Sequence, residues 1–286
     1  MFAEVTFRDL NEEHRGNVLI ATIVQADSLK HMEHFLNLIE QLAYPNNNID
    51  LAILVLDPAP TTVHAVRLYV ERANLHVSVD LYAKTLDDDL KLVFPTEQPV
   101  YELEPLQRSA MARARNYLIQ SALKVHHDHV LWLDIHLDEV PATLLQDLIQ
   151  LDVDIVVPNT MIRSGDNVLG FDRQNWQETE TSLSLQHEVA EDFIFMEGWW
   201  EFETHRLLMV DISNAADPFQ KVQLDGIGST CSLTKAEIHR SGILYAPYPY
   251  QHQLDSEAMA KMAKAAGYQV YGLPGYIIYY SNTTVS

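Results

Sequence analysis

Asp134 and His136 are the residues whose types and spacing most directly suggest chemistry. They end an apolar run, Val130-Leu131-Trp132-Leu133, and Ile135 stands between them. Side chains on a strand alternate between its two faces, so the carboxylate and the imidazole point the same way while Ile135 points into the fold. Such a pair suggests half of a divalent-metal site. The alternative is a strand that simply ends at the surface in an Asp turn.

Three arginines crowd one segment of a chain that otherwise has few cations. Arg108, Arg113 and Arg115 lie in a helix expected from Pro105 to about Leu123. A guanidinium group pairs bidentately with diphosphate oxygens and keeps its charge at any relevant pH. We expect one of these arginines to be functional and the others to pair with carboxylates.

Two more residues could complete a binding site. Asp57 ends the apolar strand Leu51–Leu56, where a carboxylate can bind a ribose hydroxyl or a base N–H; the alternative is a turn-initiating Asp before Pro58. His252 precedes an expected helix and could supply a distant ligand to the metal begun by Asp134 and His136; the alternative is an ordinary cap residue. The run His126-His127-Asp128-His129 is interpreted as a solvated loop.

Composition limits the classes of partner. The 19 basic and 40 acidic residues give a formal charge of −21, which repels phosphate backbones and excludes nucleic acid as the expected partner. An anionic small ligand would need positive charge from arginines or from a metal. The single cysteine, Cys231, excludes an internal disulfide framework. No apolar run approaches the roughly 18 residues of a membrane span.

The order of the expected elements predicts an α/β fold. Buried strands over 18–24, 51–57 and 76–82 alternate with helices, which is the pattern of a parallel sheet with right-handed crossovers. Further strands are expected over 130–134, 154–158, 269–271 and 276–280, and an antiparallel strand is expected over 206–212. We predict a single domain over residues 1–286, with an N-terminal extension at 1–17 and long loops over the site at 85–104 and 160–203.

At this point the sequence resembles the fungal Anp1/Mnn9/Van1 mannosyltransferases. The resemblance rests on the order of several short motifs and covers nearly all of the chain after about residue 17. They are Ala43-Tyr44-Pro45, Met111-Ala112-Arg113-Ala114-Arg115-Asn116, Leu131-Trp132-Leu133-Asp134-Ile135-His136, Val156-Val157-Pro158-Asn159, Leu224-Asp225-Gly226-Ile227-Gly228 and Gly267-Tyr268-Gln269-Val270-Tyr271-Gly272-Leu273-Pro274.

The resemblance implies a GT-A-like (Rossmann-like), mostly parallel sheet flanked by helices, with a small antiparallel C-terminal part. It also implies manganese-dependent transfer of an α-mannosyl group from GDP-mannose, with retention of configuration. By position, Asp134 and His136 occupy the two acidic places of the family's Asp-x-Asp motif. His252 matches a histidine that binds the same metal, and Asp57 matches an aspartate that holds the nucleoside.

The sequence departs from the family at two places. The second acid of the motif is His136, and the turn after the second strand is Pro58-Ala59-Pro60. A nitrogen ligand suits Mn²⁺ better than Mg²⁺, which prefers an all-oxygen shell. The altered turn leaves open that the donor is another nucleotide sugar.

The resemblance also assigns roles around the donor. The metal neutralises the donor diphosphate, and Arg113 or Arg108 adds fixed positive charge at the same oxygens. Asp225 and Asp255 are candidates for contacts with sugar hydroxyls, and Gly226 and Gly228 would let the backbone approach the donor sugar. Trp199 and Trp200 offer flat faces for an acceptor sugar.

The primary interpretation is therefore a nucleotide-sugar-dependent hexosyltransferase that extends a mannan or another glycan, alone or in a complex with paralogues. By the same resemblance its compartment is the Golgi lumen if a membrane anchor has been removed upstream, and otherwise the cytoplasm. A catalytically weak subunit that scaffolds an active paralogue is the main alternative. A nucleotidyltransferase ranks low, because Val24-Gln25-Ala26-Asp27-Ser28 has no glycine.

Overall fold

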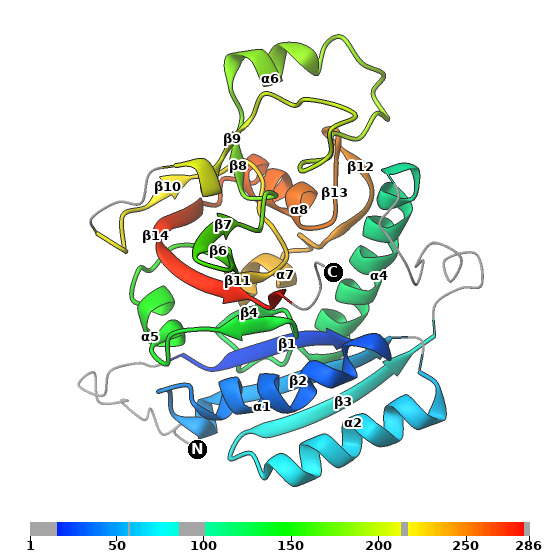
Figure 1. Ribbon diagram of the computed structural model, residues 1–286, viewed down its shortest axis with the longest axis vertical. Coiled ribbons are helices and arrows are strands. Elements are labelled where there is room, and N and C mark those ends of the chain that lie inside the picture. The colour runs from blue at the N-terminus through cyan, green and yellow to red at the C-terminus, as the bar shows by residue number, and fades with distance from the viewer. Residues whose placement is uncertain (1–15, 57, 86–100, 213–216, 283–286) are drawn as a thin grey trace, which may run out of the picture.

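A computed structural model describes residues 16–56, 58–85, 101–212 and 217–282. Its centre is a twisted sheet in the strand order β10-β14-β6-β11-β4-β1-β2-β3 (Figure 1). These strands are β1 (Val18–Val24), β2 (Ile49–Leu56), β3 (Ser78–Lys84), β4 (His129–Leu133), β6 (Ile155–Ser164), β10 (Val222–Gln223), β11 (Cys231–Lys235) and β14 (Val270–Tyr280).

Most neighbouring strands of the sheet run parallel. β3, β2, β1 and β4 are parallel to one another, and β14 is parallel to β6. β11 lies antiparallel between β4 and β6, and β10 is antiparallel to β14. The predicted fold class, a mostly parallel α/β sheet with a small antiparallel part near the C-terminus, is confirmed. Within the described ranges, none of the helices has the length and apolar character that a membrane crossing requires.

Helices cover both faces of the sheet, because the side chains of each strand alternate between two apolar layers. Leu131 and Leu133 face one core together with α1 (Met32–Glu40) and α5 (Leu144–Ile149). Val130 and Trp132 face the other core together with α4 (Glu104–Ala122) and α8 (Asp255–Ala265). The remaining helices are α2 (Pro60–Ala73), α6 (Glu180–Leu185) and α7 (Ala236–Arg240).

The region 160–203 was wrongly expected to be loop throughout. β6 continues to Ser164 and forms a hairpin with β7 (Asn167–Gly170), and β8 (Trp176–Gln177) and α6 follow. In Figure 1, α6 and the chain after it stand at the top, away from the sheet. The strand expected over 206–212 is only β9 (Leu207–Leu208) followed by a 3-10 turn, and β8 and β9 pair with each other.

Other boundaries also differ from the prediction. The two expected C-terminal strands form one, β14, which also pairs with β5 (Leu137–Glu139). β12 (Ala246–Tyr250) and β13 (Gln253–Leu254) form a small hairpin. β11 was missed, because its sequence Cys-Ser-Leu-Thr-Lys alternates polar and apolar residues although Ser232 and Thr234 are both buried. Most of the expected N-terminal extension and of the 85–104 loop lies outside the described residues.

Candidate active site

A cavity of about 390 Å³ lies at the carboxyl end of β4, where α/β sheets commonly bind their ligands. Asp134 enters it directly after β4, Tyr280 from the end of β14, and Arg108 from the first half of α4. The described residues that line the cavity are Glu104, Arg108, Asp134, Phe171, Asp172, Arg173, Gln174, Glu197, Gly198, Trp199, Ser229, Thr230 and Tyr280.

The structure brings Asp134 and His136 together as predicted. Ile135 between them is buried in the core, and His136 Nδ1 lies 2.9 Å from Asp134 Oδ1. The backbone N–H of His136 donates to the same oxygen at 2.8 Å. Burial raises the pKa of Asp134, but the hydrogen bonds from His136 outweigh it and bring the pKa below its usual range. Asp134 is therefore held as a carboxylate.

The pair fits two neighbouring positions around one divalent ion. Ligand distances near 2.1 Å at right angles would separate the two ligand atoms by about 3.0 Å. Asp134 and His136 have side chains 26% and 24% exposed, so solvent and a ligand reach them. The residues present could hold a metal whose other ligands come from a diphosphate and from water.

The third group beside Asp134 is Tyr280, which the sequence did not suggest. Its hydroxyl donates to Asp134 Oδ1 at 3.3 Å, and its ring stacks on Phe171 with the centroids 4.0 Å apart. Burial raises the pKa of Tyr280 strongly, and the charge of Asp134 adds to this effect. Tyr280 is therefore a neutral hydrogen-bond donor at this site.

His252, the third predicted metal ligand, lies elsewhere. It occupies the two-residue turn between β12 and β13, where Gln251 and His252 both have positive φ, as such hairpin turns require. His252 Nδ1 lies 2.9 Å from the carbonyl oxygen of Phe193, and its ring packs on Phe195. Asp134, His136 and His252 do not form one group of ligand atoms within 4.8 Å of one another.

The arginines of α4 have three different surroundings. Arg108 lines the cavity and is 7% exposed; its Nε donates to Glu104 at 2.8 Å and its Nη1 pairs with Glu257. Arg115 is buried against Asp255 of α8. Arg113 points to the exposed side of the helix and is not among the cavity residues. Of the two arginines offered for the donor oxygens, the structure brings Arg108 and not Arg113 to the cavity.

A second cation, Arg173, was missed by sequence reasoning. It is exposed and lines the cavity beside Asp172, in the stretch that was expected to be an irregular loop. Its signal in the sequence is weak, because a single arginine in a polar segment is ordinary. Together, Arg108 and Arg173 face the lining carboxylates Glu104, Asp134, Asp172 and Glu197.

Two residues assigned to the donor belong instead to the packing around Trp176. Asp225 accepts the backbone N–H of Glu178 at 2.8 Å and pairs with Lys264. A Cβ atom at Gly226 would lie 2.3 Å from the Trp176 indole, so this glycine makes room for that ring. Neither residue lines the cavity. Asp57 lies outside the described residues, and its nucleoside-binding role stays a prediction.

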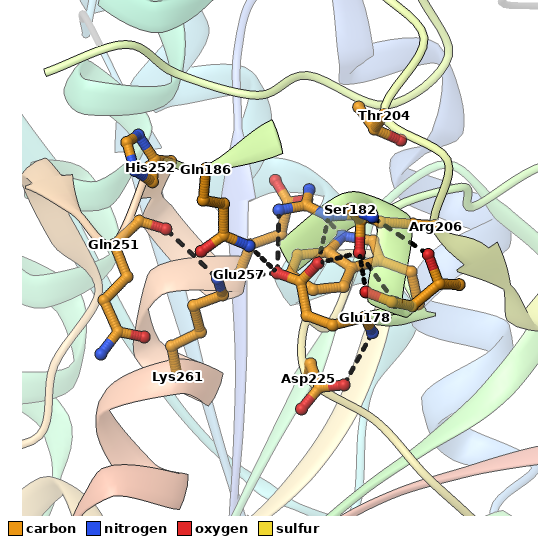
Figure 2. A network of polar contacts seen from close by, with 12 residues as sticks. Glu178, Ser182, Gln186, Thr204, Arg206, Asp225, Gln251, His252, Glu257 and Lys261 are labelled. Carbon is orange, nitrogen blue, oxygen red and sulfur yellow. Dashed lines mark hydrogen bonds and ion pairs between the residues drawn. The ribbon is translucent and has the colours of Figure 1, made fainter. Parts of the chain in front are cut away.

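Behind the cavity wall, buried ion pairs join the segment after β8 to α8 (Figure 2). Glu178 accepts from Arg206 Nη2 at 3.2 Å and from Lys261 Nζ at 2.9 Å. Arg206 also donates to the cavity residue Glu197 at 3.0 Å and lies 3.6 Å over the Trp176 ring. Burial raises the pKa of Glu178, but Arg206 and Lys261 outweigh it and lower the pKa to about 2.

Another Asp–His group lies far from the cavity. Asp50, at the start of β2, accepts from His127 Nε2 at 3.0 Å, from Lys124 Nζ at 3.2 Å and from His126 Nε2 at 3.3 Å. His127 is 1% exposed, so the expectation of a solvated loop is wrong for it. Its Nδ1 accepts the Lys124 backbone N–H at 3.0 Å, so Nε2 carries the proton and is not free for a metal. This group is a structural tie.

Solved structures with the same fold are glycosyltransferases. "Mannosyltransferase PcManGT from Pyrobaculum calidifontis in complex with GDP-Man and Mn2+" is 15% identical with a TM-score of 0.52, over 94% of this chain and 58% of that one. "GalNAc-T7 with UDP, GalNAc and Mn2+" is 12% identical with a TM-score of 0.53, over 96% of this chain and 46% of that one. The fold is therefore that of the GT-A glycosyltransferases.

The sequence places the chain more narrowly. It belongs to the Anp1 family, whose model matches residues 2–249, so the predicted family is confirmed. "Mannan polymerase complex subunit mnn9" of Schizosaccharomyces pombe is 34% identical over 87% of this chain and 76% of its own length. "Mannan polymerase II complex ANP1 subunit" of Saccharomyces cerevisiae is 28% identical over 93% of this chain and 55% of its own length.

We predict that Gly226→Ala destabilises the fold. The added methyl group would overlap the indole of Trp176, which is fully buried, so the free energy of unfolding should fall by about 1–3 kcal/mol. Chemical denaturation measures this loss. In a Trp176→Phe background the smaller ring should reduce the cost, giving a non-additive double-mutant cycle. Unchanged stability with loss of nucleotide binding would instead favour the donor role first assigned to Gly226.

We also predict that Glu178 stabilises the fold in a pH-dependent manner. Its pKa is lowered from 4.5 to about 2 on folding, so its contribution is complete above about pH 5 and is lost as the pH falls towards 2. The shift corresponds to about 3 kcal/mol. Glu178→Gln should therefore lower the free energy of unfolding more at pH 7 than at pH 3. Glu180→Gln, at an exposed position of α6, is the control. An equal loss at both pH values would refute the assignment.

Proposed function

We propose that this chain is a metal-dependent, retaining α-mannosyltransferase that uses GDP-mannose to extend a mannan or another glycan. The observation that carries the proposal is the cavity at the carboxyl end of β4, where Asp134 and His136 lie together and Arg108 lines the same wall. Membership of the Anp1 family and the GT-A fold agree with it. The GDP-mannose and Mn²⁺ named for the Pyrobaculum structure motivate the choice of donor and metal.

Charge explains why a metal is part of the proposal. The lining includes four carboxylates, Glu104, Asp134, Asp172 and Glu197, against two guanidinium groups, Arg108 and Arg173. A diphosphate would be repelled by this balance unless a cation accompanied it. When bound by Asp134 and His136, Mn²⁺ would neutralise the diphosphate and stabilise the charge of the leaving group.

The chain's own residues would do the remaining work. Arg108 spends Nε and Nη1 on Glu104 and Glu257, so it is fixed in place before any ligand arrives. Arg173, which is exposed, could close on the donor oxygens from the other side. Trp199 lines the cavity with its ring edge-to-face against Tyr101, with centroids 5.6 Å apart, and offers an apolar face to a sugar.

We extend the proposal to partners and compartment. The relatives are named as subunits of mannan polymerase complexes, so we propose that the chain assembles with paralogous glycosyltransferases. By family resemblance, we place this assembly in the Golgi lumen. The chain spans only 55% of the Saccharomyces relative, so the activity of a longer protein is part of the same proposal.

A specific observation favours a second candidate, a scaffold subunit with weak or no activity. Asp134 Oδ1 already accepts from His136 and Tyr280, and His252 binds the Phe193 carbonyl oxygen instead of joining the pair. A chain of this kind would keep the fold and the interface with a paralogue while transferring no sugar.

We predict that Mn²⁺ and GDP-mannose bind together and that binding depends on Asp134 and His136. In calorimetric titrations of the wild type, Mn²⁺ should tighten GDP-mannose binding. Asp134→Asn should abolish this effect, and His136→Ala should weaken Mn²⁺ affinity by at least about tenfold, or about 1.4 kcal/mol. Asp154→Asn and His64→Ala are matched controls, because Asp154 accepts the Gln269 backbone N–H outside the cavity and His64 is exposed on α2.

The outcomes separate the candidates. Unchanged Mn²⁺ affinity in His136→Ala would show that His136 is not a ligand. Tighter binding of a UDP-sugar would overturn the mannose assignment while leaving the enzyme proposal intact. Absence of donor binding and transfer, together with tight binding of a paralogue that is independent of metal, would support the scaffold.

A further inference from the structure

Asp172 is a second carboxylate in the cavity, and the sequence gave no reason to select it. It follows β7 and is 6% exposed. The Thr230 hydroxyl donates to its Oδ2 at 2.7 Å, and the Gln174 backbone N–H donates to its Oδ1 at 3.1 Å. The Thr230 backbone N–H adds a longer contact of 3.4 Å. Asp172 is therefore held firmly in the cavity wall.

The surrounding chain is shaped to admit this carboxylate. A Cβ atom at Gly228 would lie 2.0 Å from Asp172 Oδ2 and 2.1 Å from Oδ1, so only glycine leaves the space that the carboxylate fills. The Gly228 N–H is in turn fixed by Asn175 Oδ1 at 2.8 Å. The Thr230 hydroxyl also lies 2.7 Å from that of Thr160 in β6, which ties the arrangement to the sheet.

Asp172 differs from the other acids of the cavity in its partners. Glu104 pairs with Arg108 and Glu197 pairs with Arg206, and Asp134 has the imidazole of His136. Within the part of the chain that the structure describes, Asp172 forms no ion pair; its partners are neutral donors. Burial raises its pKa, although the bonds from Thr230 and Gln174 oppose this. Its remaining hydrogen-bonding capacity faces the cavity.

The chemistry of the wall decides what Asp172 can bind. A phosphate against it would place two like charges together, which is unfavourable in a buried site. A sugar presents several hydroxyl groups, which donate hydrogen bonds that a carboxylate can accept. Asp134 and Asp172 line the same cavity, and Tyr280 connects their surroundings, because it donates to Asp134 and stacks on Phe171. A hexose joined to a diphosphate at Asp134 would lie within reach of Asp172.

We propose that Asp172 binds hydroxyl groups of the donor hexose and so distinguishes a nucleotide sugar from the free nucleotide. This inference rests on the proposed function, and it names a residue that determines sugar recognition. Gly228 and Thr230 act as positioning residues for the carboxylate. Asp134, His136 and Arg108 act on the diphosphate, and their contribution is shared by the sugar nucleotide and the nucleotide.

The test compares two ligands on the same variants. Dissociation constants for GDP-mannose and for GDP, both with Mn²⁺, are measured by calorimetry on the wild type, Asp172→Asn and Asp154→Asn. For Asp172→Asn we expect GDP-mannose binding to weaken at least about tenfold and GDP binding to change less than about twofold. Asp154→Asn, which removes a carboxylate outside the cavity, should leave both constants unchanged.

A second variant keeps the inference testable if Asp172→Asn does not fold. Thr230→Val retains the carboxylate but removes the hydroxyl that orients it, and should weaken GDP-mannose relative to GDP by about threefold. Equal changes for the two ligands, or no change, would overturn the inference while leaving the proposed function standing. An effect confined to the KM of an acceptor oligosaccharide would overturn it in favour of an acceptor role. If the wild type binds neither ligand, the proposed function fails, and the inference fails with it.

Discussion

The arrangement of the cavity depends on one buried carboxylate, Glu257 at the start of α8. It is 1% exposed and accepts from Arg108 of α4 and from the Trp176 indole N–H at 2.6 Å. Burial raises its pKa to about 7, because the charged form is costly to desolvate, and Arg108 opposes this. A buried charge of this kind is tolerable only with its partners in place, and removing one partner typically costs about 3–5 kcal/mol. Glu257 therefore fixes Arg108 at the cavity and the Trp176 segment against α8 at the same time.

The same constraint links the described chemistry to the composition. A strongly acidic chain can hold an acidic donor only where cations are concentrated, and the buried arginines supply part of that charge. Arg108 and Arg206 are each held by two carboxylates, so their positions are fixed while much of their charge is balanced. The proposed metal at Asp134 and His136 would provide the charge that these ion pairs do not.

Local patterns predicted the features that depend on local sequence. Continuous apolar runs identified β1 and β2, and the strand end after β4 correctly brought Asp134 and His136 together. The motif Ala-Arg-Ala-Arg-Asn was recognised, but its role was not: Arg115 pairs with Asp255, and Asn116 exchanges hydrogen bonds with the Tyr245 backbone at 2.7 and 2.9 Å. Tyr280 and Asp172 could not be found, because long-range strand pairing and the space left by Gly228 bring them to the cavity. His252 failed as a ligand since its hairpin turn directs it to Phe193.

A crystal structure grown with Mn²⁺ and GDP would test the central claim most directly, because the anomalous signal of manganese locates the ion without assumptions. The account predicts one strong peak in contact with Asp134 and His136, with the diphosphate between that ion and Arg108. A peak at Asp50, His126 and His127, or a nucleotide bound away from the cavity, would contradict it.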